Sequence, residues 1–308
     1  MKKELNIKIF VAHHKPWYIY EDDVYVPIQV WKKKAKVDLW ILWDDTGDSI
    51  SEKNSNYAEL TAQYWVWKNY DLSDVDYVWF CHYRRFMTYC YKPNIFNYIF
   101  AKNFYSPSEG KNNAILRRLT AFKDHHCLFK FNENKIKQNG YALKKFINDS
   151  KIDIYLAKKN WLLNEMIWSL YKTDNRVMFW GFWSEENELS DECIKLFIKM
   201  YPEQKQIISE IENDGKYIEL ARRHMFIMKK KLFMQYAERL FNYLFELEKL
   251  IEKKHLDLSM HWAGKKDGRF MWIFSESLIN YWIKDMQNKE NIKTSYKANT
   301  LMFTDYYF

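Results

Sequence analysis

Three apolar segments of strand length lie in the first third of the chain, and each is followed by a cluster of polar residues. The segments cover residues 6–12 (NIKIFVA), 37–43 (VDLWILW) and 76–81 (DYVWFC), and the polar clusters cover 13–15, 44–48 and 82–85. Nearly continuous apolar strands joined by helices are typical of a parallel sheet that is covered on both faces. Ligands of such sheets bind beyond the carboxyl ends of the strands. We therefore expect the three clusters to converge on one crevice.

Helical and extended patterns alternate along the rest of the chain. Asn56 can cap a helix over residues 57–68, and Glu59 completes a capping box. Further helices are predicted over residues 189–200, 231–254 and 269–286, and further strands over 152–156 and 224–228. The middle, residues 91–148, has only weak periodicity. These patterns predict an α/β fold with a mostly parallel sheet, helices on both faces and a helical C-terminal part.

Composition limits the domain number and the cellular location. The chain has 308 residues with 7 Gly and 5 Pro and no visible linker, so we expect a single domain over residues 1–308. Its 4 cysteines are irregularly spaced, which fits a reducing compartment. No window of 18 uncharged apolar residues predicts a membrane span, and the run at Ile7–Ala12 is too short for a signal-peptide core. We expect a cytoplasmic protein.

The net charge of +8 favours an anionic partner, such as nucleic acid, a phosphorylated ligand or an acidic membrane face. The basic clusters are short, as at 32–34 and 229–231, and the chain has no dense basic stripe or RNA-binding motif, which argues against nucleic acid. Aromatic residues make up 19% of the chain and can stack on sugars and bases or fill the core. Peripheral contact with the inner membrane through basic and aromatic patches stays open.

Arg84 and Arg85 are the strongest candidates for holding a phosphate group. They follow a buried strand, and a guanidinium grips phosphate oxygens with two parallel hydrogen bonds while staying charged. His82 can donate to a phosphate or bind a metal. The alternative is that one of the two arginines only pairs with a surface acid.

Two other polar clusters are candidates for the same ligand. Asp44, Asp45 and Asp48 can hold a metal, bind ribose hydroxyls or only shape the turn around Gly47. The cluster at 13–15, with His13, His14 and Lys15, stands where nucleotide-binding folds commonly meet the base and the ribose. A lone histidine is more often structural than a ligand, so a structural role is the alternative here.

Asp267 and Glu276 are candidates for a catalytic base. An inverting sugar transfer needs a carboxylate that takes the proton of the acceptor hydroxyl. Glu276 lies in the last predicted helix, at the border of its buried face. The alternative for Glu276 is an ordinary solvated helix residue.

Seven segments of the chain, taken together, resemble the capsular-polysaccharide and O-antigen glycosyltransferase family built on the DUF4422 domain, which includes galactofuranosyltransferases. They are FVAHHKPW (10–17), DDVYVPIQV (22–30), WDDTGDSISEKNSNYAELTAQYWVWKN (43–69), DYVWFCHYRRF (76–86), DIYLAKKNW (153–161), HMFIMKKKLFMQYAERLFNYLFELE (224–248) and GRFMWIFSESLINYWI (268–283). The chain departs from the family at Glu276-Ser277, where members usually carry Glu-Arg, and at His224, where they usually carry Asn.

The resemblance implies a GT-A-like (Rossmann-like) fold and a hexosyltransferase. The implied donor is a nucleotide-diphosphate sugar, UDP-linked, with UDP-galactofuranose or another hexose as the sugar. The implied acceptor is a growing bacterial capsule or lipopolysaccharide O-antigen glycan, which includes lipid-linked glycans. Residues of about 1–100 would form the donor half, and about 101–308 the acceptor-binding and helical half. The residues expected to bind the donor are Ala12, His13, Lys15, Asp44, Asp45, Asn54, Tyr57, Glu59, His82, Tyr83, Arg84 and Arg85.

The resemblance also bears on a metal cofactor. The HYRR element, residues 82–85, stands where many GT-A enzymes carry the metal-binding D-x-D, so that His82 and Arg84 take the two aspartate positions. Arg cannot bind a cation, so the metal ligands stay unknown and a need for Mg²⁺ or Mn²⁺ stays open. A non-catalytic glycan-binding module would also explain the aromatic residues, although such proteins are usually rich in β structure.

Overall fold

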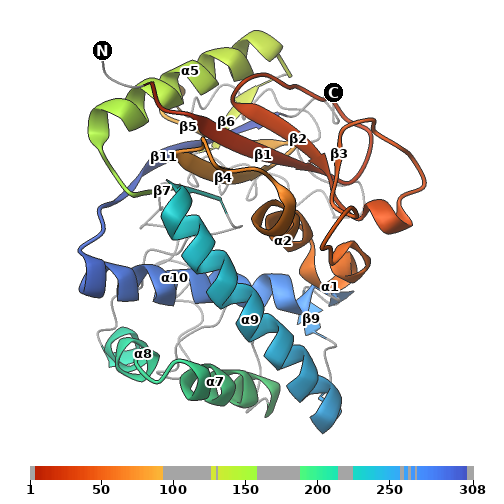
Figure 1. The fold of residues 1–308 in the computed structure, drawn as a ribbon, viewed down its shortest axis with the longest axis vertical. Coiled ribbons are helices and arrows are strands. Elements are labelled where there is room, and N and C mark those ends of the chain that lie inside the picture. The colour runs from red at the N-terminus through yellow and green to blue at the C-terminus, as the bar shows by residue number, and fades with distance from the viewer. Residues whose placement is uncertain are drawn as a thin grey trace, which may run out of the picture.

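The first four parallel strands form one half of a central sheet. The computed structural model describes residues 4–92, 126–129, 131–157, 188–213, 225–256, 260–262, 265–267 and 269–303. Strand β1 (Ile7–His13) lies between β2 (Tyr25–Gln29) and β4 (Tyr77–His82), and β3 (Leu42–Trp43) continues the sheet beside β2. All these pairings are parallel, so the carboxyl ends of the four strands point in the same direction, toward one end of the sheet (Figure 1).

The other half of the sheet is mixed. On the far side of β4 lies the antiparallel strand β8 (Phe226–Lys229), followed by β7 (Ile154–Ala157). The long strand β11 (Thr294–Phe303) runs parallel to β7 and to β6 (His126–Phe129) and antiparallel to β5 (Arg85–Thr88). Within the described residues this sheet has nine strands. A separate hairpin pairs β9 (Met260–Trp262) with β10 (Lys265–Asp267).

Helices cover both faces of the sheet (Figure 1). Helix α5 (Glu133–Ser150) lies on one face, and α2 (Leu60–Asn69), α9 (Lys230–Lys254) and α10 (Phe270–Glu290) lie on the other. Side chains of β4 alternate between two cores: Val78 and Phe80 pack with α9, whereas Trp79 packs with Ile136 and Leu143 of α5. This alternation follows from the two-residue period of a strand. It explains why β4 reads as a continuous apolar run.

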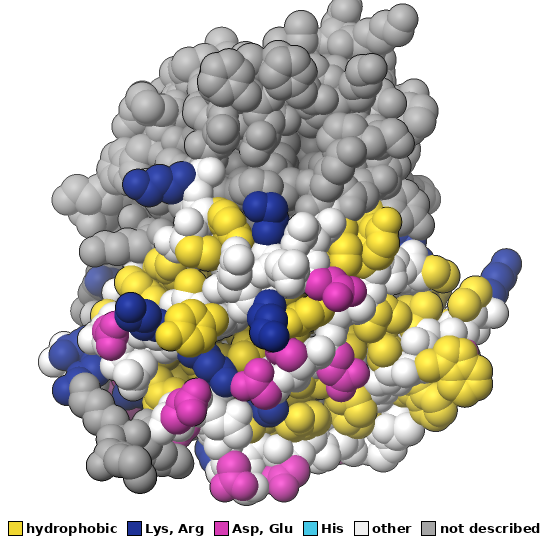
Figure 2. All heavy atoms as spheres, turned by 90° about the horizontal axis from the view of Figure 1, so that it is seen from above, with side chains coloured by type: hydrophobic (Ala, Val, Ile, Leu, Met, Phe, Trp, Pro, Cys, Tyr) yellow, Lys and Arg dark blue, Asp and Glu magenta, His cyan; other side chains and the backbone are white. Residues whose placement is uncertain are grey.

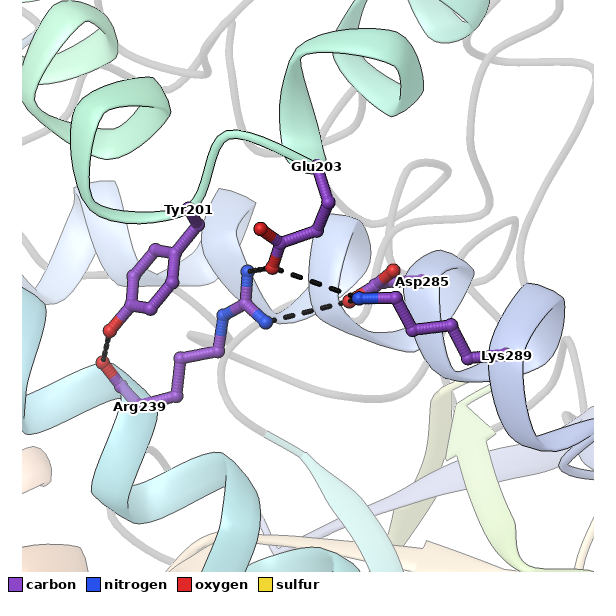
Figure 3. A network of polar contacts seen from close by, with 5 residues as sticks. All are labelled: Tyr201, Glu203, Arg239, Asp285 and Lys289. Atoms are coloured by element: carbon purple, nitrogen blue, oxygen red, sulfur yellow. Dashed lines mark hydrogen bonds and ion pairs between the residues drawn. The ribbon is translucent and has the colours of Figure 1, made fainter.

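A charged network joins the helical part of the chain (Figure 3). Helices α7 (Glu188–Met200) and α8 (Gln204–Asn213) are connected by a short turn that carries Tyr201 and Glu203. Arg239 of α9 lies 2.9 Å from Glu203 and 3.4 Å from the buried Asp285 of α10, and its guanidinium stacks 3.9 Å from the Tyr201 ring centre. Lys289 also pairs with Asp285, at 2.9 Å. The network therefore connects three helical segments.

The predicted fold class is confirmed: an α/β protein with a mostly parallel sheet, helices on both faces and a helical C-terminal part. The strands predicted over residues 6–12, 76–81, 152–156 and 224–228 correspond to β1, β4, β7 and β8, and the helices predicted over 189–200, 231–254 and 269–286 correspond to α7, α9 and α10. Residue 224 lies outside the described ranges. Among the described residues, no helix is both long enough and apolar enough to cross a bilayer.

The strand predicted over residues 37–43 is wrong in most of its length. Only Leu42 and Trp43 pair with β2, because Trp40 takes a left-handed backbone conformation, at φ 56°, and stands 85% exposed. The second full strand is instead β2, whose residues are all buried. Its Pro27 is unusual inside a sheet, because proline lacks the N–H of the ladder. Since β3 pairs only with Ile28 and Gln29, Pro27 lies where β2 has β1 alone beside it.

The helix predicted over residues 57–68 is also corrected. A short helix α1 (Asn54–Tyr57) ends at Ala58, whose backbone is left-handed (φ 46°, ψ −128°), and α2 begins two residues later. Asn56 does not cap a helix, and neither of these described helices has a side-chain cap. Asn54 instead donates to the Ala58 carbonyl at 2.6 Å and to the Thr61 hydroxyl at 3.0 Å, which holds the break between the helices.

Candidate functional site

The carboxyl ends of β1 and β4 place two of the predicted polar clusters side by side. Ala12 lies opposite His82 in the parallel register, and the Tyr83 amide donates to the Ala12 carbonyl at 3.2 Å. The chain leaves the sheet at His13 and His14 on one strand and at His82 and Tyr83 on the other. The predicted convergence is therefore confirmed for residues 13–15 and 82–85.

Three imidazole rings surround the Tyr83 ring. The ring centres of His13, His14 and His82 lie 5.6, 5.3 and 4.4 Å from that of Tyr83, and His14 and His82 lie 5.8 Å apart. Burial, and after it the charge of the nearby His82, lower the pKa of His13 to about 3 and the pKa of His14 to about 4. Burial also lowers the pKa of His82, against the opposing effect of Glu59. The three rings are therefore uncharged near neutral pH.

Glu59 is the carboxylate of this cluster and reaches it from the break between α1 and α2. Its Oε1 lies 3.1 Å from His82 Nε2. Burial acts to raise the pKa of Glu59, but the hydrogen bond from His82, the positive charge of His82 when it is protonated at low pH, the local backbone and nearby Arg269 outweigh burial and lower the pKa to about 2. The pair therefore consists of an ionised Glu59 that accepts the Nε2–H of a neutral His82, a contact that fixes the imidazole's tautomer.

Cationic side chains gather around the same rings. Burial lowers the pKa of Lys15, and the charge of Arg84 lowers it further. The Arg84 guanidinium lies 5.1 Å from the Tyr83 ring centre. Arg85 is the first residue of β5. Burial is the main cause of the lowered pKa of His82; the charge of Arg85 lowers this pKa further, whereas Glu59 raises it. Arg269 lies directly before α10, far from Glu59 in the sequence, and its charge lowers the pKa of Glu59. The site thus combines several fixed cations with one carboxylate.

Several buried polar atoms of this region have no hydrogen-bond partner among the described residues. They are His13 Nδ1, His82 Nδ1, Glu59 Oε2, Arg84 Nε and both amide atoms of Gln63. Gln63 lies one turn after Glu59 on α2 and is 1% exposed. Buried polar atoms in folded proteins are nearly always paired, so this group of unpaired atoms makes the region a candidate binding site.

The predicted residues 44–48 do not join this group. Asp44 is fully buried and accepts hydrogen bonds from the amides of Trp31 and Lys32, each at 3.1 Å, and from the Ser51 hydroxyl at 2.7 Å. Burial raises its pKa, against these hydrogen bonds. Asp48 accepts from the Tyr64 hydroxyl of α2 at 2.8 Å. Asp44 and Asp48 therefore organise loops at the β3 side of the sheet.

The remaining predicted residues have mixed environments. Asp45 is half-buried, and its Oδ1 has no partner within the described ranges. Asn54 and Tyr57 are buried in α1, where Asn54 supports the Ala58 carbonyl. Two residues that the sequence reasoning missed belong near the site, Gln63 and Arg269. Arg269 stands in one of the seven segments quoted above, next to the start of the last predicted helix, and this position was its only signal.

The two candidate bases lie toward the C-terminal part. Glu276 is half-buried on α10, two turns after Arg269. Burial raises the pKa of Tyr236 on α9, and the charge of Glu276 raises it further, so Glu276 lies near this hydroxyl. Asp267 is the last residue of β10, where its backbone pairs with Met260, and its side chain lies outside the described part of the structure.

The donor set of the site does not fit Mg²⁺ or Mn²⁺. These hard cations take oxygen ligands, chiefly from several carboxylates and water. Among the described residues the cluster offers the single carboxylate Glu59, and Arg84 and Lys15 stand where a cation would be repelled. In the described ranges no three His, Cys, Asp or Glu side chains are arranged to hold a metal ion.

The fold defines the class: an α/β protein with a largely parallel sheet, whose strand ends carry unpaired polar atoms and cationic side chains among the described residues. The chain belongs to the DUF4422 family, described as a domain of unknown function, whose model matches residues 8–289. This match confirms the family resemblance drawn from the sequence.

The structure is similar to an apo structure of WbbM, a bifunctional glycosyltransferase, with a TM-score of 0.67 and 25% sequence identity. The likeness covers 97% of this chain and 45% of that protein, so the chain spans less than half the length of its structural relative. No curated protein matches the chain. The fold is thus one that a glycosyltransferase uses.

Proposed function

We propose that the protein is a glycosyltransferase with a GT-A-like fold that works on the cytoplasmic side of bacterial surface-polysaccharide assembly. It transfers a hexosyl residue, galactosyl or galactofuranosyl, from a UDP-linked donor to a growing capsule or O-antigen glycan. The family match and the likeness to a glycosyltransferase support this class of reaction. The observation that carries it is the cationic cluster at the ends of β1 and β4.

The cations of this cluster suit the diphosphate of a nucleotide sugar. When the glycosidic bond breaks, negative charge develops on the leaving diphosphate, and fixed cations stabilise that charge without rearranging. Arg84 has an unpaired Nε and lies over Tyr83, and Lys15 is close enough for the Arg84 charge to lower its pKa. In this proposal Arg84, Arg85 and Lys15 hold the diphosphate and take the role that a metal ion has in other enzymes.

The neutral imidazoles suit the uncharged part of the donor. Glu59 accepts the Nε2–H of His82, so His82 Nδ1 carries a lone pair that can accept a hydrogen bond from a hydroxyl group. His13 Nδ1 is likewise unpaired and buried. We assign these two atoms to the ribose or the base of the nucleotide. Glu59 is then a positioning residue, because it sets which nitrogen of His82 faces the donor.

The acceptor hydroxyl must lose its proton as it attacks the sugar. Glu276 and Asp267 remain the two carboxylates proposed for this step. The base takes the proton, the acceptor oxygen forms the new bond to the anomeric carbon, and the UDP diphosphate leaves with the electron pair of the broken bond. The cationic cluster receives that charge.

Calorimetry with a panel of nucleotides and nucleotide sugars, with and without Mg²⁺ or Mn²⁺, tests the donor site. We expect selective binding of UDP and UDP-sugars that does not depend on either metal. Absence of binding to every nucleotide in both conditions would refute the donor site and leave a glycan-binding module as the better reading. Binding only in the presence of a metal would refute the role given to the arginines.

A further inference from the structure

An apolar and basic surface stands out at the β3 edge of the sheet. Large hydrophobic side chains in residues 31–43 are strongly exposed: Trp31 (39%), Val37 (51%), Trp40 (85%), Leu42 (37%) and Trp43 (37%). We call this group the Trp40 surface. Figure 2 shows hydrophobic side chains gathered at the right of the view, on the side where β3 lies in Figure 1, with a Lys or Arg side chain projecting at the rim.

The backbone holds two of these tryptophans in a costly conformation. Trp31 and Trp40 have φ angles of 61° and 56°, in the left-handed region that bulky residues avoid. A residue kept there costs about 1–3 kcal/mol and persists only where the surroundings impose it. The backbone therefore accepts strain at two residues whose side chains contribute little to the core.

Hydrogen bonds impose this loop conformation. The Gln29 side chain donates to the Val37 carbonyl at 2.8 Å and accepts from the Leu39 amide at 3.0 Å. Asp38 accepts from the Trp40 amide at 2.9 Å, and Asp44 accepts from the amide of Trp31. Leu39 anchors the loop in the interior. A loop that is fixed by side-chain hydrogen bonds thus keeps these tryptophans exposed to solvent.

Exposed lysines lie next to the Trp40 surface along the chain. Lys33, Lys34 and Lys36 are exposed, and η1 (Lys32–Lys34) places three lysines in one turn. Lys32 pairs with Asp38 at 2.9 Å and lies 4.7 Å from the Trp43 ring centre, and Lys33 lies 3.7 Å from Glu52. Lys34 and Lys36 have no ion pair in the described part of the chain. Exposed cationic charge that no ion pair offsets, at Lys34 and Lys36, therefore lies next to the apolar group within the described residues.

We propose that the Trp40 surface binds the surface of a lipid bilayer that contains anionic lipids. Tryptophan with aliphatic neighbours fits the boundary between headgroups and acyl chains, and lysines at its rim pair with anionic headgroups. A sugar would need free polar groups beside the rings. Here Gln29, Asp38 and Asp44 are occupied in holding the loop, so the surface offers apolar faces and positive charge instead.

The register of the sheet brings this surface close to the candidate site. Trp43 lies opposite Gln29, and Gln29 lies opposite His13, in neighbouring parallel strands. Two strand spacings separate Trp43 from His13, which is about 10 Å. A bilayer bound at the Trp40 surface would therefore lie near the ends of β1 and β4. The inference about the bilayer does not depend on the reaction proposed above.

Co-sedimentation with vesicles tests this inference on the full chain. Vesicles of phosphatidylcholine mixed with phosphatidylglycerol are compared with phosphatidylcholine alone, at low and high NaCl. Trp40→Asn removes the ring and suits the left-handed backbone, so it should fold normally while binding falls about tenfold. Tyr141→Asn, at an exposed aromatic of α5, is the matched control and should bind like the wild type.

A second pair of variants isolates the charge. Replacing Lys33, Lys34 and Lys36 with Glu should reduce binding to the anionic vesicles by about a hundredfold. The same replacement at three exposed lysines elsewhere (Lys137, Lys145 and Lys253) changes the net charge equally and should have a much smaller effect. The inference is overturned if the wild type does not prefer anionic vesicles or if the two triple variants lose binding equally. A dimer that Trp40→Asn dissociates, without vesicle binding, would overturn it too.

Discussion

At the scale of single residues, substitution of Arg84 is the most direct test of the proposed reaction. We expect Arg84→Ala to lower kcat/KM by about 30-fold to 1,000-fold, because one preorganised contact to the developing charge is worth about 2–4 kcal/mol. Arg84→Lys should recover only part of the activity, since Lys lacks the bidentate fork. Initial rates of UDP release measure both variants. Lys137→Ala on α5 serves as control, and near wild-type rates in Arg84→Ala would remove the proposed role.

Glu276 separates catalysis from donor binding. If Glu276 is the base, Glu276→Gln should abolish transfer and leave the UDP affinity in calorimetry unchanged, because the amide keeps the shape and cannot take a proton. Asp267→Asn is measured in parallel, since the same role is open to it. A fall in UDP affinity together with activity would show that Glu276 acts on the donor or on the fold instead.

The buried histidines predict a pH dependence of stability. The pKa of His13 is lowered from 6.5 to about 3. The unfolded chain therefore binds more protons below pH 6.5, and the free energy of unfolding falls as the pH drops from 6.5 toward 3. For His13 the loss between pH 7 and pH 4.5 is about 2–3 kcal/mol. Urea unfolding should show a shallower pH profile for His13→Gln. His255→Asn, at an exposed histidine, should keep the wild-type slope.

At the scale of elements, the break between α1 and α2 positions Glu59 through a strained residue. Ala58 has φ 46° and ψ −128°, a region that glycine adopts freely and alanine does not. We expect Ala58→Gly to raise the free energy of unfolding by about 1 kcal/mol. Ala62→Gly, inside α2, should lower it by about 1 kcal/mol or more. Denaturant titration distinguishes the two, and a loss of stability in Ala58→Gly would show that the break carries no strain.

The elements that the sequence predicted are those whose pattern reports burial directly. Strand β4 alternates between two cores and so is apolar throughout, and α9 has a clear helical stripe. Strand β2 was not predicted. Its Pro27 is unusual in a sheet interior, and the short pairing of β3 makes it tolerable there. Residues 37–43 look like a buried strand because they are mostly apolar. Apart from the buried Leu39, their large apolar side chains are mostly exposed, and hydrophobicity alone does not reveal this.

The sequence predicted those site residues whose position follows from the strand topology. It did not predict the roles that depend on individual side-chain contacts. Parallel strand ends brought His13 and His82 together as expected. The role of Asp44 depends on the hydrogen bonds that it accepts from the amides of Trp31 and Lys32. The spacing of these residues in the sequence does not predict such bonds. Arg269 lies close enough to Glu59 to lower its pKa, although more than 200 residues separate the two in the sequence. Contacts of such separation follow from the complete fold.

At the scale of the whole molecule, the Arg239 network joins the helical part (Figure 3). Arg239→Ala leaves Asp285, which is 2% exposed, without its guanidinium partner. We expect a loss of about 2 kcal/mol in the free energy of unfolding, since breaking a buried pair is costly while Lys289 still compensates part of the Asp285 charge. Lys249→Ala breaks an exposed bridge to Glu246 and should cost about 0.5 kcal/mol or less. Equal effects of the two substitutions in thermal unfolding would contradict a buried role.

The placement of β11 has a consequence for the order in which the molecule can be made. Residues 294–303 pair with both β5 and β7, and Met302 lies opposite Arg85 at the start of the strand that leaves the site. While the ribosome is still synthesising residues before 294, β5 and β7 present open edges that can join a neighbouring chain. The arginine side of the site is therefore complete only after β11 has been synthesised, and until then these two strand edges can join a neighbouring chain.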